Sequence, residues 1–196
     1  MWTEPVYRDL LAVERGKLDV DSFRQRYMHR KAILVLDITG FTETGMELGE
    51  IQSFLRILNI HKLCDPVLRS HDATLVRAFA DDLVALFDDP NSALNAAFAI
   101  HDRVELLKSS RHDLLVAPCC IGVGYGDVFA IGPNLAMGNE MNQASKLGED
   151  TATAGETLLT ANAYRGVRER ADVHFAPIND VLPFSYVRAT ASASMI

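Results

Sequence analysis

The order of apolar and polar positions predicts a helical start followed by a buried strand and a second helix. In residues 1–30, apolar side chains recur at helical spacing on both sides of Gly16, which predicts a short, polar, helical lead-in. Between Lys31 and Asp37 every residue is apolar, as in a strand with both faces buried. Helical spacing returns from Ile51 to Val67.

The next segments add two strands, a helix and a further strand to this order. Two short apolar runs at 73–79 and 83–87 predict strands, and the alanine-rich segment 93–107 predicts a helix. A further strand is expected at 114–124, with 127–131 as its hairpin mate. The order strand-helix-strand-strand-helix-strand is that of a ferredoxin-like βαββαβ core.

The C-terminal third extends this core. The same patterns predict a helix at 141–147, a strand at 157–160, a helix at 162–170 and strands at 173–176 and 184–188. We therefore expect an α+β fold in which helices cover one face of a mostly antiparallel sheet. The expected division is a lead-in over residues 1–30 and one domain over residues 31–196.

Composition and charge narrow the range of partners. The 196 residues carry 19 Lys and Arg against 26 Asp and Glu, a formal charge of -7, which disfavours nucleic acid and anionic membranes as partners. No apolar run is long enough to span a bilayer, and the N-terminus lacks the pattern of a signal peptide. Three cysteines in apolar contexts suggest reduced thiols. We expect a soluble, cytoplasmic protein.

Two acidic positions carry candidate chemistry. Asp37 ends an apolar strand just before a Gly40 turn, and the doublet Asp81-Asp82 lies between two predicted strands. Each has an ordinary interpretation, as a capping or turn residue for Asp37 and as a type I′ hairpin turn for the doublet. The split topology, however, brings the first strand beside this hairpin. Two carboxylates with no lysine or arginine between them would then favour a divalent cation.

A third segment, Gly138 to Leu147, places an amide and a cation on one helical face. Asn142 and Lys146 are four residues apart, so they share one side of a helix. Such a pair suits contacts with phosphate and sugar, and it equally suits an ordinary exposed face.

Taken together, these segments resemble the class III adenylate/guanylate cyclase catalytic domain. The resemblance rests on Asp37-Ile-Thr-Gly-Phe-Thr42, on Val76-Arg-Ala-Phe-Ala-Asp81-Asp-Leu-Val-Ala-Leu-Phe87, and on Ile121-Gly-Val-Gly-Tyr-Gly126 followed by Gly138-x-x-x-Asn142-x-Ala-Ser-Lys-Leu147. It extends from about Lys31 to Arg188.

The resemblance implies the class III nucleotidyl cyclase fold and a nucleotidyl cyclase activity. A nucleoside triphosphate, with ATP expected, would be converted to its 3′,5′-cyclic monophosphate and pyrophosphate with two Mg²⁺ or Mn²⁺ ions per site. The resemblance places the ions on Asp37 and Asp81, with help from the Ile38 carbonyl. It also implies a head-to-tail homodimer that shares its active sites.

The resemblance assigns the remaining site residues as well. It places the β- and γ-phosphates on the backbone amides of Thr39, Gly40, Phe41 and Thr42, and the ribose on Asn142. Lys146 stands where the family has an arginine that stabilises the reacting phosphate. Arg77 and Leu135 occupy the two positions that recognise the base.

Several of these positions depart from the family pattern and leave an alternative function open. Lys146 replaces an arginine, Arg77 and Leu135 differ from the adenine-recognising pair, and Ala80 replaces a glycine. The C-terminal strand pair lacks the lysine that some members use for phosphate. The alternative is a catalytically weak, cyclase-like module that binds nucleotide or regulates by dimerising. A diguanylate cyclase is disfavoured, because its Gly-Gly-Asp/Glu-Glu-Phe signature is absent.

Overall fold

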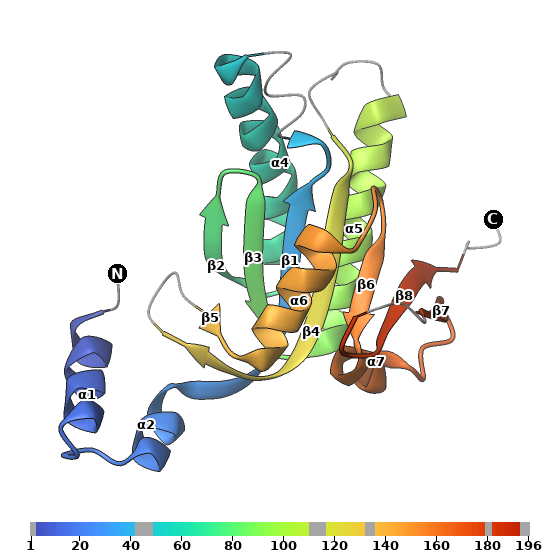
Figure 1. The fold of residues 1–196 in the computed structure, drawn as a ribbon. Coiled ribbons are helices and arrows are strands. Elements are labelled where there is room, and N and C mark those ends of the chain that lie inside the picture. Colours follow the sequence, from blue (N-terminus) through green and yellow to red (C-terminus); the bar gives the residue numbers. More distant parts are fainter. Residues whose placement is uncertain (1–2, 42–48, 110–116, 132–135, 179–181, 193–196) are drawn as a thin grey trace.

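The computed structural model describes residues 3–41, 49–109, 117–131, 136–178 and 182–192. Their elements are α1 (Glu4–Glu14), α2 (Val20–Tyr27), β1 (Met28–Ile38), α4 (Glu50–Ser70), β2 (Thr74–Phe79), β3 (Asp82–Phe87), α5 (Pro90–Ser109), β4 (Cys119–Ala130), β5 (Ala136–Met137), α6 (Asn139–Asp150), β6 (Thr157–Thr160), α7 (Ala161–Val167), β7 (Val173–Ile178) and β8 (Tyr186–Ala191) (Figure 1). Among the helices of these ranges, none is long and apolar enough to cross a membrane.

One eight-stranded sheet organises the chain. The strand order is β2-β3-β1-β4-β6-β8-β7, with β5 paired to β4. Every pairing is antiparallel except that of β4 with β6. The order β2-β3-β1-β4, with α4 and α5 as the two connecting helices, confirms the ferredoxin-like core and the α+β class.

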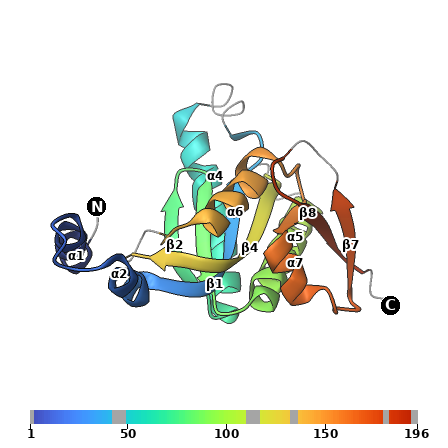
Figure 2. The ribbon, with the colours of Figure 1, turned by 60° about the horizontal axis from the view of Figure 1, so that its bottom comes forward.

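Helices cover both faces of this sheet, so the expectation of a single covered face is wrong. Leu34 and Leu36 of β1 pack in one cluster with α4, α5 and α7. The alternate residues Ile33 and Val35 pack on the other face, in a cluster that contains Ala144 of α6. Figures 1 and 2 show α6 lying across the face opposite α4 and α5. This two-sided cover explains why β1 is apolar at consecutive positions.

The expected break in the fourth strand is also wrong. β4 runs without interruption and pairs with β1 from Met28↔Phe129 to Ile38↔Cys119, so 127–131 continues the strand instead of turning back. Its hairpin partner is the short β5. Gly124 and Gly126 lie within β4, where a Cβ at either would come within 3.2 Å of Glu140 on α6. They are small because a helix packs on them.

The two N-terminal helices pack at one end of the sheet. Val6 of α1 and Phe23 of α2 form a small buried cluster with Ile131, just beyond β4. Between the two helices, the buried Asp9 carboxylate accepts hydrogen bonds from Arg26 (2.8 Å) and the Tyr27 hydroxyl (2.9 Å). From Thr3 onward, this lead-in thus forms two helices, of which the second ends at Tyr27. Its separation from a catalytic domain over residues 31–196 stays a prediction.

Candidate functional site

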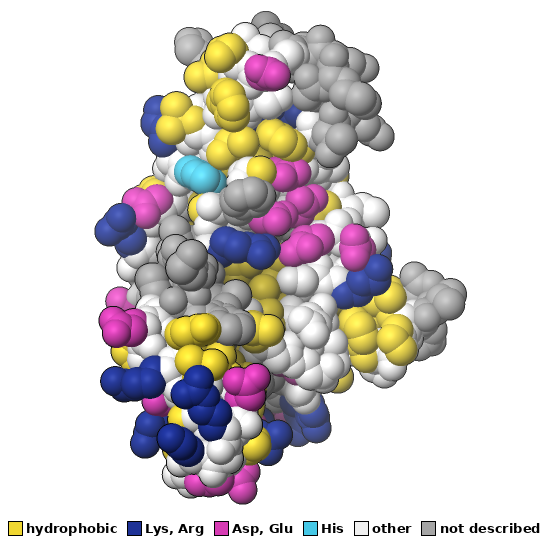
Figure 3. Space-filling view, turned by 60° about the vertical axis from the view of Figure 1, so that its left-hand side comes forward, with side chains coloured by type: hydrophobic (Ala, Val, Ile, Leu, Met, Phe, Trp, Pro, Cys, Tyr) yellow, Lys and Arg dark blue, Asp and Glu magenta, His cyan; other side chains and the backbone are white. Residues whose placement is uncertain are grey.

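Three carboxylates meet where β1 ends and β3 begins. Asp37 is the penultimate residue of β1, Asp81 lies in the loop between β2 and β3, and Asp82 begins β3. Because β1 and β3 pair antiparallel, these positions adjoin, and one oxygen of each carboxylate lies within 4.8 Å of the others. The structure thus brings Asp37 and Asp81 together, beside the buried Ile38. Figure 3 shows acidic side chains gathered on this side of the molecule.

The hairpin that carries Asp81 turns one residue earlier than expected. Phe79 pairs with Asp82, so the two loop residues are Ala80 and Asp81 rather than the acidic doublet. Ala80 has φ +51°, in the left-handed region that favours glycine. The strained residue is the one that stands at the family's glycine position.

Electrostatics at the cluster favour a bound cation. Burial, followed by the charges of Asp81, Asp82 and Glu149, raises the pKa of Asp37 to about 7. Burial also raises the pKa of Asp82 and of Glu149. Arg77 lies beside them, with its Nη2 3.4 Å from Asp82 Oδ2 and 4.0 Å from Glu149 Oε1. Arg77 thus lies beside two of the four carboxyl groups, and the three aspartates of the cluster form an all-oxygen donor set that suits Mg²⁺ or Mn²⁺.

The turn that follows β1 is held in place by the neighbouring strand. The Thr39 amide donates to the Pro118 carbonyl (3.0 Å), and its hydroxyl lies 3.3 Å from the Cys120 sulfur. Gly40 has φ +66°, and Phe41 packs against the main core cluster. The segment expected to hold phosphates is therefore a fixed turn directly after Asp37.

Asn142 and Lys146 are both exposed on α6 and share one side of the helix, as expected from their spacing. The Lys146 ammonium pairs with Asp150 at 3.0 Å, one turn further along. Thr42 and Leu135, which the resemblance assigned to phosphate and base, lie outside the described residues.

The structure adds three residues that sequence reasoning did not place at the site. Asp82 was treated as a turn residue, although it forms a doublet with a candidate ligand. Glu149 follows Asn142 by seven residues and so shares its helical face, which is a signal the sequence contained. Arg56 lies on the buried side of α4, four residues before Ile60, where it interrupts an apolar stripe. Its Nη2 donates to the Thr39 carbonyl at 3.3 Å.

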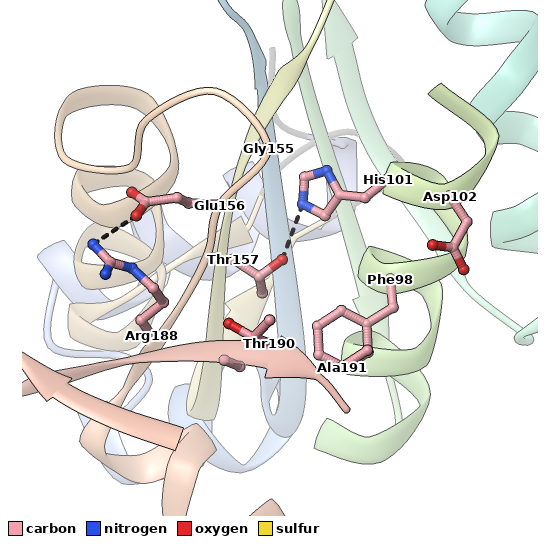
Figure 4. A pocket seen from close by; sticks show the side chains of 10 residues that line it. Phe98, His101, Asp102, Gly155, Glu156, Thr157, Arg188, Thr190 and Ala191 are labelled. Atoms are coloured by element: carbon pink, nitrogen blue, oxygen red, sulfur yellow. Dashed lines mark hydrogen bonds and ion pairs between the residues drawn. The ribbon is translucent and has the colours of Figure 1, made fainter. Parts of the chain in front are cut away.

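A second hollow, of about 280 Å³, lies between α5 and strands β6 and β8 (Figure 4). Two of its polar side chains are already paired within its wall. His101 Nε2 lies 3.0 Å from the Thr157 hydroxyl, and Arg188 lies 2.6 Å from Glu156. The carboxylate cluster is therefore the better candidate for a functional site.

Several solved cyclase domains share this fold. The adenylyl cyclase CyaB from P. aeruginosa aligns with a TM-score of 0.72 and 18% identity, covering 86% of this chain and 98% of that chain. A guanylate cyclase domain from Catenaria anguillulae, solved in complex with GTP, aligns with a TM-score of 0.68 and 17% identity over 84% and 98% of the two chains. A bacterial light-regulated adenylyl cyclase aligns with a TM-score of 0.70 and 17% identity, covering 84% of this chain and 90% of that chain.

Comparison of sequences finds a relative of another kind. No protein-family model matches the chain. The serine/threonine-protein kinase pkn2 from Myxococcus xanthus is 30% identical over 149 residues, 74% of this chain. The chain spans only 17% of that relative's length, so kinase activity is not transferred to it. The sheet order and the structural likeness to adenylyl and guanylyl cyclases together show that this chain has the fold of a class III nucleotidyl cyclase catalytic domain.

Proposed function

We propose that the chain is a nucleotidyl cyclase that converts a nucleoside triphosphate, with ATP preferred, into the 3′,5′-cyclic monophosphate and pyrophosphate. One observation carries this proposal. Oxygen atoms of Asp37, Asp81 and Asp82 lie within 4.8 Å of one another at adjoining strand ends of a cyclase fold. A domain with only a structural role has no need to hold like charges this close.

The carboxylate cluster fits a pair of divalent cations. Asp37 and Asp81 would hold Mg²⁺ or Mn²⁺ together with the Ile38 carbonyl, and Asp82 extends the same donor set. The bound ions would supply positive charge that polarises the α-phosphate and lowers the pKa of the ribose 3′-hydroxyl. No His or Cys belongs to the cluster, as expected for a hard cation.

Other residues would bind and orient the substrate. The backbone amides of Gly40 and Phe41 would hold the β- and γ-phosphates in the turn after β1, while the Thr39 amide, which donates to the Pro118 carbonyl, keeps this turn in place. Asn142 would orient the ribose, and Lys146 would neutralise charge that develops on the α-phosphate. The 3′-oxygen loses its proton and bonds to the α-phosphorus, while the bond to the bridging oxygen breaks and releases pyrophosphate.

Base recognition follows from Arg77. A guanidinium only donates hydrogen bonds, so it suits the N1 acceptor of adenine and the carbonyls of pyrimidines, but not the N1–H of guanine. We therefore expect ATP first, UTP or CTP at detectable rates, and GTP last. Adenylyl and guanylyl cyclases both share this fold, so the fold itself does not decide between them.

We also infer a head-to-tail homodimer in which each site combines the carboxylates of one protomer with Asn142 and Lys146 of the other. An exposed apolar stripe supports a protein partner. Four residues of α4 lie at i, i+3, i+4 and i+7 and are 68%, 64%, 36% and 49% exposed: Ile51, Phe54, Leu55 and Leu58. Figure 3 shows apolar side chains gathered on this side of the molecule, next to the acidic group.

A second candidate is a catalytically weak, cyclase-like module that binds nucleotide or regulates through dimerisation. One observation favours it: Lys146 and Arg77, the two cations assigned to the substrate, already lie beside carboxylates of their own protomer. Lys146 pairs with Asp150, and Arg77 lies beside Asp82 and Glu149.

Turnover distinguishes the two candidates. The purified chain is incubated with each of the four ribonucleoside triphosphates and either Mn²⁺ or Mg²⁺, and any cyclic product is identified by mass. The proposal expects cyclic AMP as the main product. Nucleotide binding without any cyclic product would favour the second candidate, and a clean preference for GTP would overturn the role of Arg77.

A further inference from the structure

Arg56 is a cation at a position that otherwise belongs to the apolar core. The buried side of α4 includes Arg56, Ile60, Cys64 and Val67, at spacings that place them along one stripe. Arg56 is only 7% exposed. Burying a guanidinium costs free energy unless an anion or a full set of acceptors surrounds it. A position like this one ordinarily holds leucine or isoleucine.

The hydrogen bonding of this guanidinium is incomplete. Its Nη2 donates to the Thr39 carbonyl at 3.3 Å, but the buried Nη1 has no partner among the residues that the structure describes. Burial lowers the pKa of Arg56, and no charged group of the described chain offsets this effect. A positive charge therefore lies next to the turn after β1, and no described residue supplies a counter-charge.

We propose that Arg56 is a substrate-binding residue whose free Nη1 donates to the phosphate chain of the bound nucleoside triphosphate. This inference rests on the proposed function, which places the β- and γ-phosphates on the turn from Thr39 to Phe41. Arg56 already touches that turn through the Thr39 carbonyl. A triphosphate is a strong anion with many acceptor oxygens, so it supplies what the buried cation lacks.

The proposal also explains how the site can bind a triphosphate although the two cations assigned to the substrate lie beside carboxylates of the same protomer. Lys146 is paired with Asp150, and Arg77 lies beside two carboxylates. Among the described residues, Arg56 has one hydrogen-bond partner, the Thr39 carbonyl, and it lies on the buried side of α4. A cation fixed by packing loses little side-chain entropy when the ligand binds.

The competing explanation is that Arg56 only anchors the Thr39 carbonyl. The two roles predict opposite effects of Arg56→Leu on stability without ligand. A pure anchor would lower the melting temperature when removed. A ligand-binding cation, uncompensated in the free protein, would leave the melting temperature unchanged or raised, because leucine completes the apolar stripe.

The test measures binding of α,β-methylene-ATP, which cannot release pyrophosphate, and of AMP, in each case by calorimetry at fixed Mn²⁺. Arg56→Leu should weaken binding of the triphosphate analogue about 10- to 100-fold. AMP has the same base and ribose but a single phosphate, so its affinity should change less than about 2-fold. Arg56→Lys keeps the charge, so its affinity for the triphosphate analogue should lie between those of the wild type and Arg56→Leu.

Arg69→Leu is the matched control, since Arg69 is an exposed arginine of α4 that pairs with Asp65 at 2.8 Å. It removes the same charge from the same helix and should bind both ligands like the wild type. Equal affinity of Arg56→Leu and wild type for the analogue would overturn the inference. So would a lowered melting temperature with equal losses for analogue and AMP. Absence of analogue binding by the wild type would overturn the proposed function as well.

Discussion

At the scale of single residues, the Asp37 carboxyl links stability to pH. Burial and the neighbouring carboxylates raise its pKa in the folded protein to about 7, whereas an unfolded aspartate titrates near its ordinary value of about 3.9. Between these values the folded state binds a proton that the unfolded state releases. The stability that this carboxyl contributes is therefore complete below about pH 4 and is lost as the pH rises through about 7.

Without divalent cations, the melting temperature of the wild type should thus fall between pH 5 and pH 8. Asp37→Asn should show a flatter profile and a higher melting temperature than the wild type at pH 8, because an amide carries no charge to repel its neighbours. Thermal denaturation in EDTA across this range measures both effects. Asp21→Asn, at an exposed position of α2, is the control and should follow the wild type. If the melting temperatures of Asp37→Asn and wild type changed with pH in parallel, this would contradict the raised pKa of Asp37 in the cluster.

Ala80 allows a separate test of backbone strain. Its φ of +51° costs an alanine about 1 kcal/mol relative to glycine, so Ala80→Gly should raise the free energy of unfolding by roughly that amount. Ala78→Gly, within strand β2 of the same hairpin, should lower it by about 0.5–1 kcal/mol. Urea denaturation of the two variants compares them directly. A loss of stability in both would show that the left-handed backbone at Ala80 is not strained.

At the scale of elements, the apolar patterns predicted the types and the order of the strands and helices, because these depend on which faces each element buries. The apolar runs of β1 and β3 and the helical spacing of α4 and α5 are consequences of which faces each element buries, so their types and order followed from the sequence. The two errors, at the end of β4 and in the placement of α6, share one cause. Both depend on the contact of α6 with Gly124 and Gly126 of β4, which joins segments that are separated in the sequence. Close packing of distant segments leaves no local pattern.

The contact between β4 and α6 yields a graded prediction. A Cβ at Gly122 would lie 2.2 Å from the Ala144 carbonyl oxygen and 2.6 Å from the Gly148 nitrogen, both backbone atoms. Gly122→Ala should therefore lower the free energy of unfolding by about 2–3 kcal/mol. Gly126→Ala would meet only the Glu140 side chain, at 3.2 Å, and should cost clearly less. Chemical denaturation ranks the two, and equal costs would contradict backbone-to-backbone packing of α6 on β4.

The candidate site was likewise predictable only in part. The meeting of Asp37 and Asp81 followed from the order of strands, because neighbouring strands bring their ends together. Asp82 and Glu149 join them through the exact turn of the hairpin and through the docking of α6, and neither is fixed by spacing alone. Arg56 depends on how α4 lies against the end of β1. The order of the strands thus predicts where the site lies, whereas tertiary packing determines which further polar residues join it.

At the scale of the whole molecule, the proposed dimer places the two halves of each site on different protomers. Mixing Asp37→Asn chains with Lys146→Ala chains should then restore activity that neither variant has alone. With free exchange of subunits, about half of the dimers are mixed and each has one intact site, so about a quarter of the wild-type rate is expected. Native mass spectrometry, which separates the mixed dimer from the two unmixed ones by mass, first confirms that the chains exchange. Mixtures that exchange but stay inactive would show that each site lies within one protomer.

The most direct measurement is the rate of cyclic nucleotide formation by wild type, Asp37→Asn and Asp81→Asn under the same saturating Mn²⁺ and ATP. Both changes keep the shape of the side chain and remove one anionic ligand, so each should lower turnover by about 100-fold or more while the melting temperature is unchanged or raised. Asp65→Asn, on the exposed side of α4, is the control and should retain wild-type turnover. Wild-type turnover in both cluster variants would contradict a carboxylate-held metal site as the catalytic centre.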